Sequence, residues 1–415
     1  MKKNELWAYW QLPVILLLSI SAVILFSKVQ LLPAEPVSFS QLFSDPQESP
    51  TSDLSQLHMP VQAVVNNGYG RNYFFGTTES TSYLRFLPLL QEAFGSAVLQ
   101  PSPSQEAFAQ AMLSPGIFFD FGTDYSAELF YQLYLSEAGS FPGAVRHLIL
   151  STAEDGQRVF LYLSDEDGNL RCFSTAVSAA SLLQALENTS HTSASFAMEY
   201  SDTLYPYTIY PDDLSIYPQF GVSNAIDDDL IQTLAQLLGM NSHSEPYVES
   251  NGTQVLVEES SSLRVYGDGT ISYQGLQPVS DLLSVSGGDN PTQLDALNSA
   301  WALAVQLTAD YCSAEQQLYL QSCQPAEGGY LIYFGYMLNG IPVQLHQDTF
   351  ALRIRTNGNC ISAFTLYRRS YTPLDSRSLL MPVRQAIAAG SDSGELWIGY
   401  ADTGKETIAA QWLGR

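Results

Sequence analysis

Two stretches of the chain, 263–275 and 352–364, carry the same hairpin pattern. The first has the sequence LRVYGDGTISYQG and the second LRIRTNGNCISAF. In each, apolar and polar residues alternate on both sides of an Asp-Gly or Asn-Gly pair, which favours two antiparallel strands joined by a tight turn. In the first copy Leu263, Val265 and Ile271 are expected to face inward. The chain is therefore predicted to build antiparallel sheet that buries one face and leaves the other available.

Each hairpin belongs to a longer unit in which a helix precedes several strands. Helical spacing of apolar residues runs through AIDDDLIQTLAQLLGMN before the first hairpin and through NPTQLDALNSAWALAVQLTADYC before the second. We therefore predict an α+β fold whose C-terminal half repeats a helix-plus-β-meander unit, similar to PepSY-type modules. The strands predicted after the second helix are Leu318–Cys323, Tyr330–Met337, Ile341–Leu345, Phe350–Arg355 and Cys360–Tyr367.

An earlier region, 61–202, predicts a separate α+β domain of antiparallel sheet with packed helices. Helical spacing occurs in STSYLRFLPLLQEAFGSAV, SQEAFAQAML and AASLLQALENT. VQAVVNN and GIFFDFG predict strands, whereas AELFYQLYL is ambiguous between helix and strand. HLILSTAEDGQRVFLYLSDEDGNLRCFST predicts three strands joined by Asp-Gly and Gly-Asn turns.

Shifts in composition set the remaining boundaries. The stretch after the N-terminal apolar segment is rich in Ser, Pro and acid, which is typical of an extended stalk. A later stretch is full of Tyr-Pro, and proline interrupts regular strand pairing. The predicted parts are a tip and anchor at 1–30, a stalk at 31–60, the N-terminal domain at 61–202, a Tyr/Pro linker at 203–222, a middle repeat at 223–290 and C-terminal repeats at 291–415.

The N-terminal segment Leu6–Phe26 contains no charged residue. About 20 apolar residues span the hydrocarbon core of a bilayer as a helix. Lys2 and Lys3 precede it and favour a cytoplasmic N-terminus, so the body would lie outside the cell membrane. The rival interpretation is a cleaved signal peptide, but SKVQLLPAEP after Phe26 lacks a good small-x-small cleavage site. We expect a single-pass signal anchor.

Small and polar side chains occur within this predicted anchor. Ser19, Ser21 and Ala22 are close together in the sequence, and small residues let two membrane helices approach each other closely. We therefore expect these three residues to contact a helix of a membrane partner.

Charge excludes one class of partner. The chain has 17 basic and 42 acidic residues, a formal net charge of −25. Such a surface repels phosphate backbones, so nucleic acid is not an expected partner. No lysine occurs between Lys28 and Lys405, which excludes lysine-dependent catalysis in most of the body.

A search for catalytic or metal motifs is negative. HExxH, GxSxG and Gly-rich phosphate loops are absent, and the four cysteines form no CxxC pair. Whether Cys312 and Cys323 pair is left open. Asp165–Asn169 is the best candidate for Ca²⁺, but an acidic hairpin turn explains it more simply. We predict no catalytic residue, no cofactor and no metal, and expect a protein that is not an enzyme.

One stretch in the C-terminal half, GGYLIYFGYMLNGIPVQL, resembles a motif of the YycH/YycI regulatory proteins of Gram-positive bacteria. The chain also ends on a Trp-containing strand candidate, as that family does. The residues that carry the resemblance are Tyr330, Ile332, Phe334, Asn339, Gly340, Pro342, Val343 and Trp412.

The resemblance implies a membrane-anchored regulator without catalytic residues. It implies binding to a membrane sensor histidine kinase of a two-component system that controls cell-wall metabolism, and pairing with a sister YycH/YycI-type protein. An alternative stays open at this point: an anchored or secreted wall-active enzyme, or an inhibitor-like PepSY-type binding module.

Overall fold

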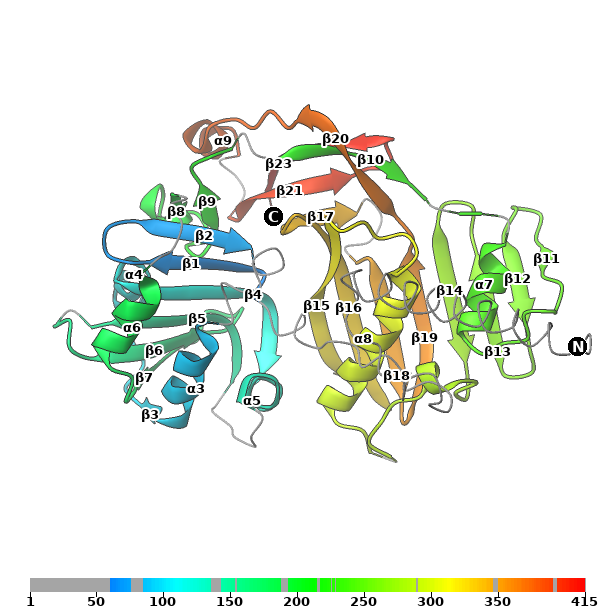
Figure 1. Ribbon diagram of the computed structural model, residues 1–415, viewed down its shortest axis with the longest axis horizontal. Helices are drawn as coiled ribbons and strands as arrows, with labels where there is room; N and C mark the ends of the chain where they lie inside the picture. The colour runs from blue at the N-terminus through cyan, green and yellow to red at the C-terminus, as the bar shows by residue number, and fades with distance from the viewer. Residues whose placement is uncertain are drawn as a thin grey trace, which may run out of the picture. The chain divides into compact units, whose positions relative to one another are not determined.

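The computed structural model describes a set of ranges that begins after the predicted anchor (Figure 1). The predicted anchor, with Ser19, Ser21 and Ala22, lies outside these ranges, as does the predicted stalk up to residue 59. No helix among the described residues is long and apolar enough to cross a membrane. The described ranges are 60–75, 85–135, 143–153, 155–187, 193–214, 217–224, 226–227, 229–288, 290–345, 350–390 and 394–414.

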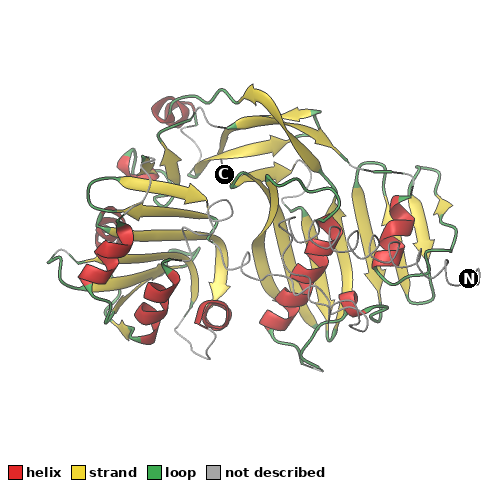
Figure 2. Cartoon of the chain, viewed as in Figure 1, coloured by secondary structure: helices red, strands yellow, loops and turns green. Residues whose placement is uncertain are grey.

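The predicted α+β class is confirmed. The described residues form seven α-helices and four sheets, in which helices lie against the two largest sheets (Figure 2). The first large sheet has seven antiparallel strands in the order β2-β1-β4-β5-β6-β7-β3. Its strands are β1 (Gln62–Asn66), β2 (Arg71–Phe75), β3 (Val98–Leu99), β4 (Gly116–Ser126), β5 (Ala144–Thr152), β6 (Val159–Ser164) and β7 (Leu170–Ser174).

Both faces of this sheet are covered. Helices α3 (Leu87–Gly95), α5 (Ala127–Leu135) and α6 (Ala179–Leu186) share a hydrophobic core with one face. Helix α4 (Gln105–Leu113) packs on the opposite face in a second core, and its N-cap Ser104 accepts a hydrogen bond from a backbone N–H of the first turn. The ambiguous segment AELFYQLYL is therefore a helix, because its apolar residues face the core shared with α3.

The second large sheet has eleven strands. Ten lie in the order β11-β12-β13-β14-β19-β18-β16-β17-β21-β23, and β15 pairs with β16 outside this path. The five strands predicted after residue 317 are confirmed as β15 to β19. The strands are β11 (Tyr247–Val248), β12 (Gln254–Val257), β13 (Ser261–Val265), β14 (Thr270–Gly275), β15 (Gln316–Ala326), β16 (Gly329–Leu338), β17 (Ile341–Leu345), β18 (Leu352–Asn357), β19 (Cys360–Tyr367), β21 (Leu396–Asp402) and β23 (Ala410–Gly414).

The two similar hairpins lie side by side in this sheet. β13–β14 is the first and β18–β19 the second, and β14 pairs with β19 in antiparallel register. Tyr273 lies opposite Phe364, and their rings stack with centroids 5.4 Å apart. Helices α7 (Leu230–Leu237) and α8 (Gln293–Thr308) cover the same face of the sheet, and Thr292 and Asp295 form a capping box at the start of α8.

The Tyr/Pro-rich segment 203–222, expected to be a linker, contains two short strands. β9 (Ile209–Pro211) pairs with β8 (Ala194–Phe196), and β10 (Pro218–Ser223) lies between two strands from the end of the chain. The prolines stand at the last position of β9 and the first of β10, where a missing N–H disturbs the ladder least. The neighbours of β10 are β20 (Ser370–Arg377) and β22 (Thr407–Ile408), and α9 (Val383–Ala389) follows β20.

Two fully buried tyrosines of the second sheet provide a matched test of its core. The Tyr336 hydroxyl donates to the Tyr367 carbonyl at 2.6 Å and lies 2.7 Å from the Tyr311 hydroxyl. The Tyr273 hydroxyl is buried and has no hydrogen-bond partner among the described residues. We expect Tyr336→Phe to lower the free energy of unfolding by about 1–2 kcal/mol, because it removes both of these buried hydrogen bonds.

The same change at Tyr273 removes a hydroxyl that makes no bond, so we expect Tyr273→Phe to leave the stability unchanged or to raise it. Urea unfolding followed by tryptophan fluorescence compares both variants with the parent chain. An equal loss in the two variants would contradict this account of the core.

Candidate functional site

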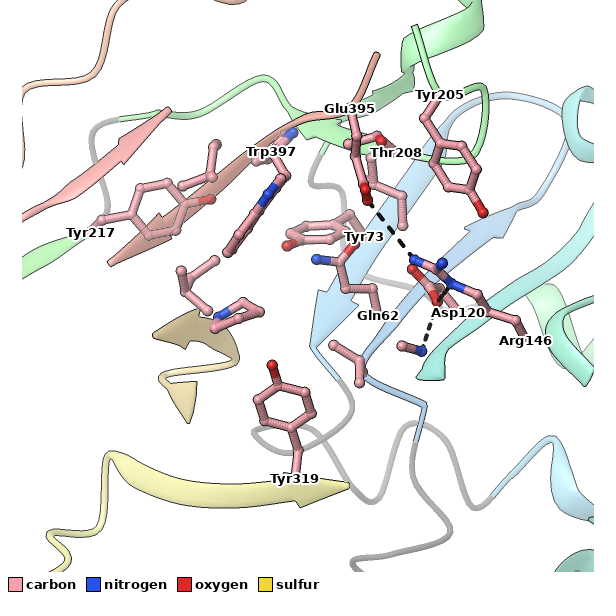
Figure 3. A pocket seen from close by; sticks show the side chains of 17 residues that line it. Gln62, Tyr73, Asp120, Arg146, Tyr205, Thr208, Tyr217, Tyr319, Glu395 and Trp397 are labelled. Atoms are coloured by element: carbon pink, nitrogen blue, oxygen red, sulfur yellow. Dashed lines mark hydrogen bonds and ion pairs between the residues drawn. The ribbon is translucent and has the colours of Figure 1, made fainter. Parts of the chain in front are cut away.

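A cavity of about 110 Å³ lies where the first sheet meets β15, β17 and β21 (Figure 3). Its walls come from segments that are far apart in the sequence. The first sheet contributes polar side chains, and Trp397 of β21 lies across the cavity from them. Five aromatic rings also line the cavity and come from Tyr73, Tyr205, Tyr217, Tyr319 and Trp397.

Arg146 of β5 is the central charge of this cavity. It is only 8% exposed, and carboxylates from three separate segments surround its guanidinium. Nη1 donates to Glu166 at 3.2 Å, whereas Nε lies 3.8 Å from Asp120 and Nη2 lies 3.9 Å from Glu395. The two longer distances exceed a direct hydrogen bond, and such gaps are commonly bridged by water. Arg146 therefore links β4, the β6–β7 turn and the start of β21.

Burial and charge act in opposite directions on Arg146. Burial lowers its pKa, but Asp120, Tyr205, Glu395 and Glu166 together raise the pKa above its ordinary value. The guanidinium also lies over the ring of Tyr205, with Cζ 5.4 Å from the ring centroid. Arg146 thus stays charged while it is buried, and the carboxylates around it compensate that charge.

Several buried polar atoms of the lining have no hydrogen-bond partner among the described residues. These atoms are Arg146 Nε, the Tyr205 hydroxyl, Thr208 Oγ1 and the Tyr217 hydroxyl. Burial raises the pKa of both tyrosines, so their hydroxyls remain protonated near neutral pH. Buried polar atoms of this kind are normally satisfied by water or by a polar group of a ligand.

His147 lies beside this cluster and is fully buried. Its Nδ1 is 2.9 Å from Ser164 Oγ, its Nε2 is 3.7 Å from Asp120, and its ring stacks on Phe118 and contacts Tyr207. Burial is the main reason that its pKa falls to about 4. The charge of Arg146 also lowers this pKa, and Asp120 partly opposes both effects. His147 is therefore neutral near pH 7.

The structure shows where the metal and disulfide candidates of the sequence lie. Among the described residues, no group of three or more His, Cys, Asp or Glu side chains is placed to hold a metal ion. Asp165, from the acidic turn considered for Ca²⁺, accepts hydrogen bonds from Asn169 and Arg171. All four cysteines are free, so Cys312 and Cys323 do not pair in this structure. The cavity volume of about 110 Å³ is smaller than the roughly 300 Å³ of ordinary ligand pockets. A cavity of this size can hold water molecules or one small polar group.

The residues of the predicted family motif lie in four places, namely β16, the turn after it, β17 and β23. Ile332 and Phe334 of β16 are buried, and the ring of Phe334 lies 5.7 Å from that of Trp301 on α8. Tyr330, in the same strand, is half-buried. Two further residues, Asn339 and Gly340, have positive φ values of 49° and 81° and form the tight turn between β16 and β17.

The end of this motif reaches the cavity. Pro342 of β17 lines it, and Val343 pairs with Tyr400 in the parallel pairing of β17 with β21. Trp412 of β23 lies outside the lining: its ring packs edge-on against Tyr210, and its Nε1 donates to the Met381 carbonyl at 2.9 Å. The assignment of these residues to a family motif stays a prediction.

Sequence reasoning missed Arg146, Asp120 and Glu395. They lie up to 275 residues apart along the numbering, so no local spacing connects them. One signal was available: the strand AVRHLILST places Arg and His in an otherwise apolar run, and every residue of it after the first is buried. Charged residues in such a strand are buried only when they are paired.

The titration of His147 gives a prediction about pH. In the unfolded chain its pKa is near 6.5, whereas in the folded protein it is about 4. Below pH 6.5 the unfolded chain therefore binds a proton that the folded chain excludes. Stability from this residue falls as the pH drops from 6.5 to about 4, by about 3 kcal/mol in total.

His147→Gln should remove this component. Urea unfolding of the parent and variant at pH 7, 5.5 and 4 should show the stability difference between them shrinking by about 3 kcal/mol toward acid. If the difference in unfolding free energy between parent and variant stayed constant with pH, this would contradict a buried, neutral His147.

The guanidinium cluster gives a second prediction. Arg146→Met leaves three carboxylates without their shared cation, so we expect a loss of about 3 kcal/mol in unfolding free energy. Arg158→Met is the matched control, because the Arg158 side chain is 69% exposed and pairs with one acid, Asp155, among the residues that the structure describes; its effect should stay within about 0.5 kcal/mol. Amide hydrogen exchange in residues 394–402 should also be faster in Arg146→Met but unchanged in Arg158→Met. Similar results for both variants would overturn the proposed link to β21.

Comparison with known proteins places the fold. No protein-family model matches the chain, and no curated protein matches it. Among solved structures, the chain is similar to the crystal structure of YycH from Bacillus subtilis, with a TM-score of 0.52 and 14% sequence identity. The similarity covers 88% of this chain and 99% of the YycH chain. The chain therefore has a YycH-type fold, and the resemblance found in the sequence is confirmed at the level of the fold.

Proposed function

We propose that this YycH-type chain is a membrane-anchored extracytoplasmic regulator. It binds and modulates a two-component sensor histidine kinase that controls cell-wall metabolism. The observation that carries the proposal is the extent of the fold similarity, which covers 88% of this chain rather than one module of it. A sister YycH/YycI-type protein is proposed as a second partner.

The arrangement of the second sheet supports a duplicated unit within this regulator. α7 is followed by β11, β12, β13 and β14, which are neighbours in that order. α8 is followed by β15, β16, β18 and β19, which are neighbours in the same order, and β17 is the additional strand. We infer that the two halves are copies of one helix-plus-meander unit, joined through their last strands.

The chemistry of the cavity favours binding over catalysis. Its cation, Arg146, is shared by three carboxylates, and the neighbouring His147 is buried and neutral near pH 7. A general acid or base has to reach a substrate with a pKa near the working pH. We therefore place the function of this protein in its surfaces and its anchor, not in a reaction.

The proposed anchor supplies the contact within the membrane. Leu6–Phe26 would span the bilayer with its N-terminus in the cytoplasm, which places the body outside. Ser19, Ser21 and Ala22 would let a kinase helix approach closely, because their side chains are small.

The triple variant Ser19→Leu, Ser21→Leu, Ala22→Leu tests this contact. Bulky side chains should separate the two helices and reduce recovery of the sensor kinase in a crosslinked pull-down by about fivefold. The output of a reporter gene that depends on the kinase should change in the same variant. The control Val14→Leu, Ile24→Leu keeps the segment apolar and should leave both readouts as they are.

Equal kinase recovery and equal reporter output from both variants would contradict the anchor contact. Recovery of wall polymer without any kinase or sister protein would favour the alternative, a wall-active enzyme or a PepSY-type binding module.

A further inference from the structure

The strands of the second sheet have an unusual charge pattern. None of the strands from β11 to β19 contains Asp or Glu, although the whole chain has 42 acidic residues. The acids of this region lie in the turns at the strand ends, for example Glu258, Asp268 and Glu327. The only charged residues within these strands are arginines.

All three of these arginines lie on one face of the sheet. Arg264 is opposite Ser272, Ser272 is opposite Thr365, and Thr365 is opposite Arg353. Cross-strand partners point to the same side of a sheet, and so do residues two apart in one strand, which adds Arg355. Helices α7 and α8 pack on the other side. We call Arg264, Arg353 and Arg355 the arginine face.

The positive charge of the arginine face is not neutralised within the described protein. All three side chains are exposed, and none forms an ion pair with a carboxylate of the described residues. Arg353 donates to Thr365 Oγ1, at 3.3 Å, and lies over the ring of Phe350. Six arginines elsewhere each pair with an acid, namely Arg71, Arg146, Arg158, Arg171, Arg368 and Arg369.

A shallow groove of about 500 Å³ crosses β13, β14, β19 and β18 at one end of this face. Arg355 is the only charged residue in its lining. The floor includes small residues such as Gly275 and Ala363, and Leu276 at the rim is 85% exposed. The other lining side chains are serine, glutamine and asparagine, which can bond to the main chain of a bound segment.

We infer that the arginine face and this groove bind an extended, acidic segment of a partner protein. Carboxylates would meet the forked guanidinium groups of Arg353 and Arg355, a geometry in which two parallel hydrogen bonds form. An extended backbone suits a shallow groove that crosses four strands, and Leu276 would contact an apolar side chain of the segment. This inference rests on the proposed function in one respect: it assumes that the ligand of the groove is a protein.

Charge favours a short acidic peptide segment over a long anionic polymer. With a net charge of −25, the chain repels a polyanion that extends past the groove. A segment with two or three carboxylates matches the three arginines and places few further charges near the acidic surface. Screening limits the repulsion to about 10 Å at ordinary salt, so the match has to be local.

Peptide binding to the detergent-solubilised full chain tests this chemistry. The probe is a fluorescent peptide of alternating Glu and Leu residues, with a Gln and Leu peptide as its neutral counterpart. We expect the double variant Arg353→Gln, Arg355→Gln to bind the acidic peptide about tenfold more weakly. Arg158→Gln, in the turn before β6 of the first sheet, should bind it like the parent chain. All substituted side chains are exposed, and circular dichroism verifies that the variants fold.

Equal affinity of the parent chain for the Glu and Gln peptides, or equal affinity of the parent and double variant for the Glu peptide, would overturn the inference. Tighter binding of inorganic polyphosphate than of the Glu peptide, with the same dependence on the arginines, would overturn its choice of a polypeptide. A photo-crosslinker at Gln274 in cells should join the chain to an acid-containing segment of another protein. Attachment to a segment without acids would contradict the inference.

The kinase reporter separates this inference from the proposed function. Peptide binding that depends on the arginines, together with a reporter unaffected by any variant, would support the arginine face and contradict the regulator. The reverse result, a reporter that responds to the anchor variant while peptide binding ignores the arginines, would contradict the arginine face alone.

Discussion

The antiparallel pairing of β14 with β19 is the contact on which the second half of the protein depends. It runs from Thr270 opposite Tyr367 to Gln274 opposite Ala363, and it includes the stacked rings of Tyr273 and Phe364. Without it, each meander would end on an exposed edge strand, which is prone to pair with other chains. With it, one core continues beneath α7 and α8. The opposite face becomes a single surface on which Arg264 from one hairpin and Arg353 from the other share a row.

A second constraint directs the end of the chain back to its beginning. The Asn339-Gly340 turn reverses the chain after β16, and β17 then pairs in parallel with β21 rather than with β18. This pairing brings Glu395, the residue just before β21, to Arg146 of the first sheet. The backbone N–H of Tyr205 also donates to the Gly394 carbonyl, which reinforces the same junction. The cavity exists because these connections converge.

Local sequence patterns predicted the helices and strands well, but they did not predict which strands pair or which side chains meet in space. Ile341–Leu345 and Cys360–Tyr367 were predicted at their exact bounds, and an Asn-Gly turn shortly before each strand marks where it starts. The place of β10 between β20 and β22 could not be predicted, since side-chain alternation says which face a residue occupies but not which strand lies beside it. The same limit hid the Arg146 cluster, whose members come from β4, β5, a turn and the residue before β21. The sequence AVRHLILST did, however, show a charged residue, Arg146, within a strand of mainly apolar residues.

The weakness of exposed ion pairs connects the arginine face to the proposed anchor. An exposed Arg–carboxylate pair contributes only about 0–1 kcal/mol, so three such pairs and a shallow groove give weak binding between free molecules. Two proteins held in one membrane meet at a high effective concentration, and a weak contact is then sufficient for stable association. The anchor and the arginine face would therefore act together. The proposed anchor would supply proximity, and the strands β11 to β19, which contain no acid, would supply selectivity for an acidic partner, since the chain as a whole carries a net negative charge.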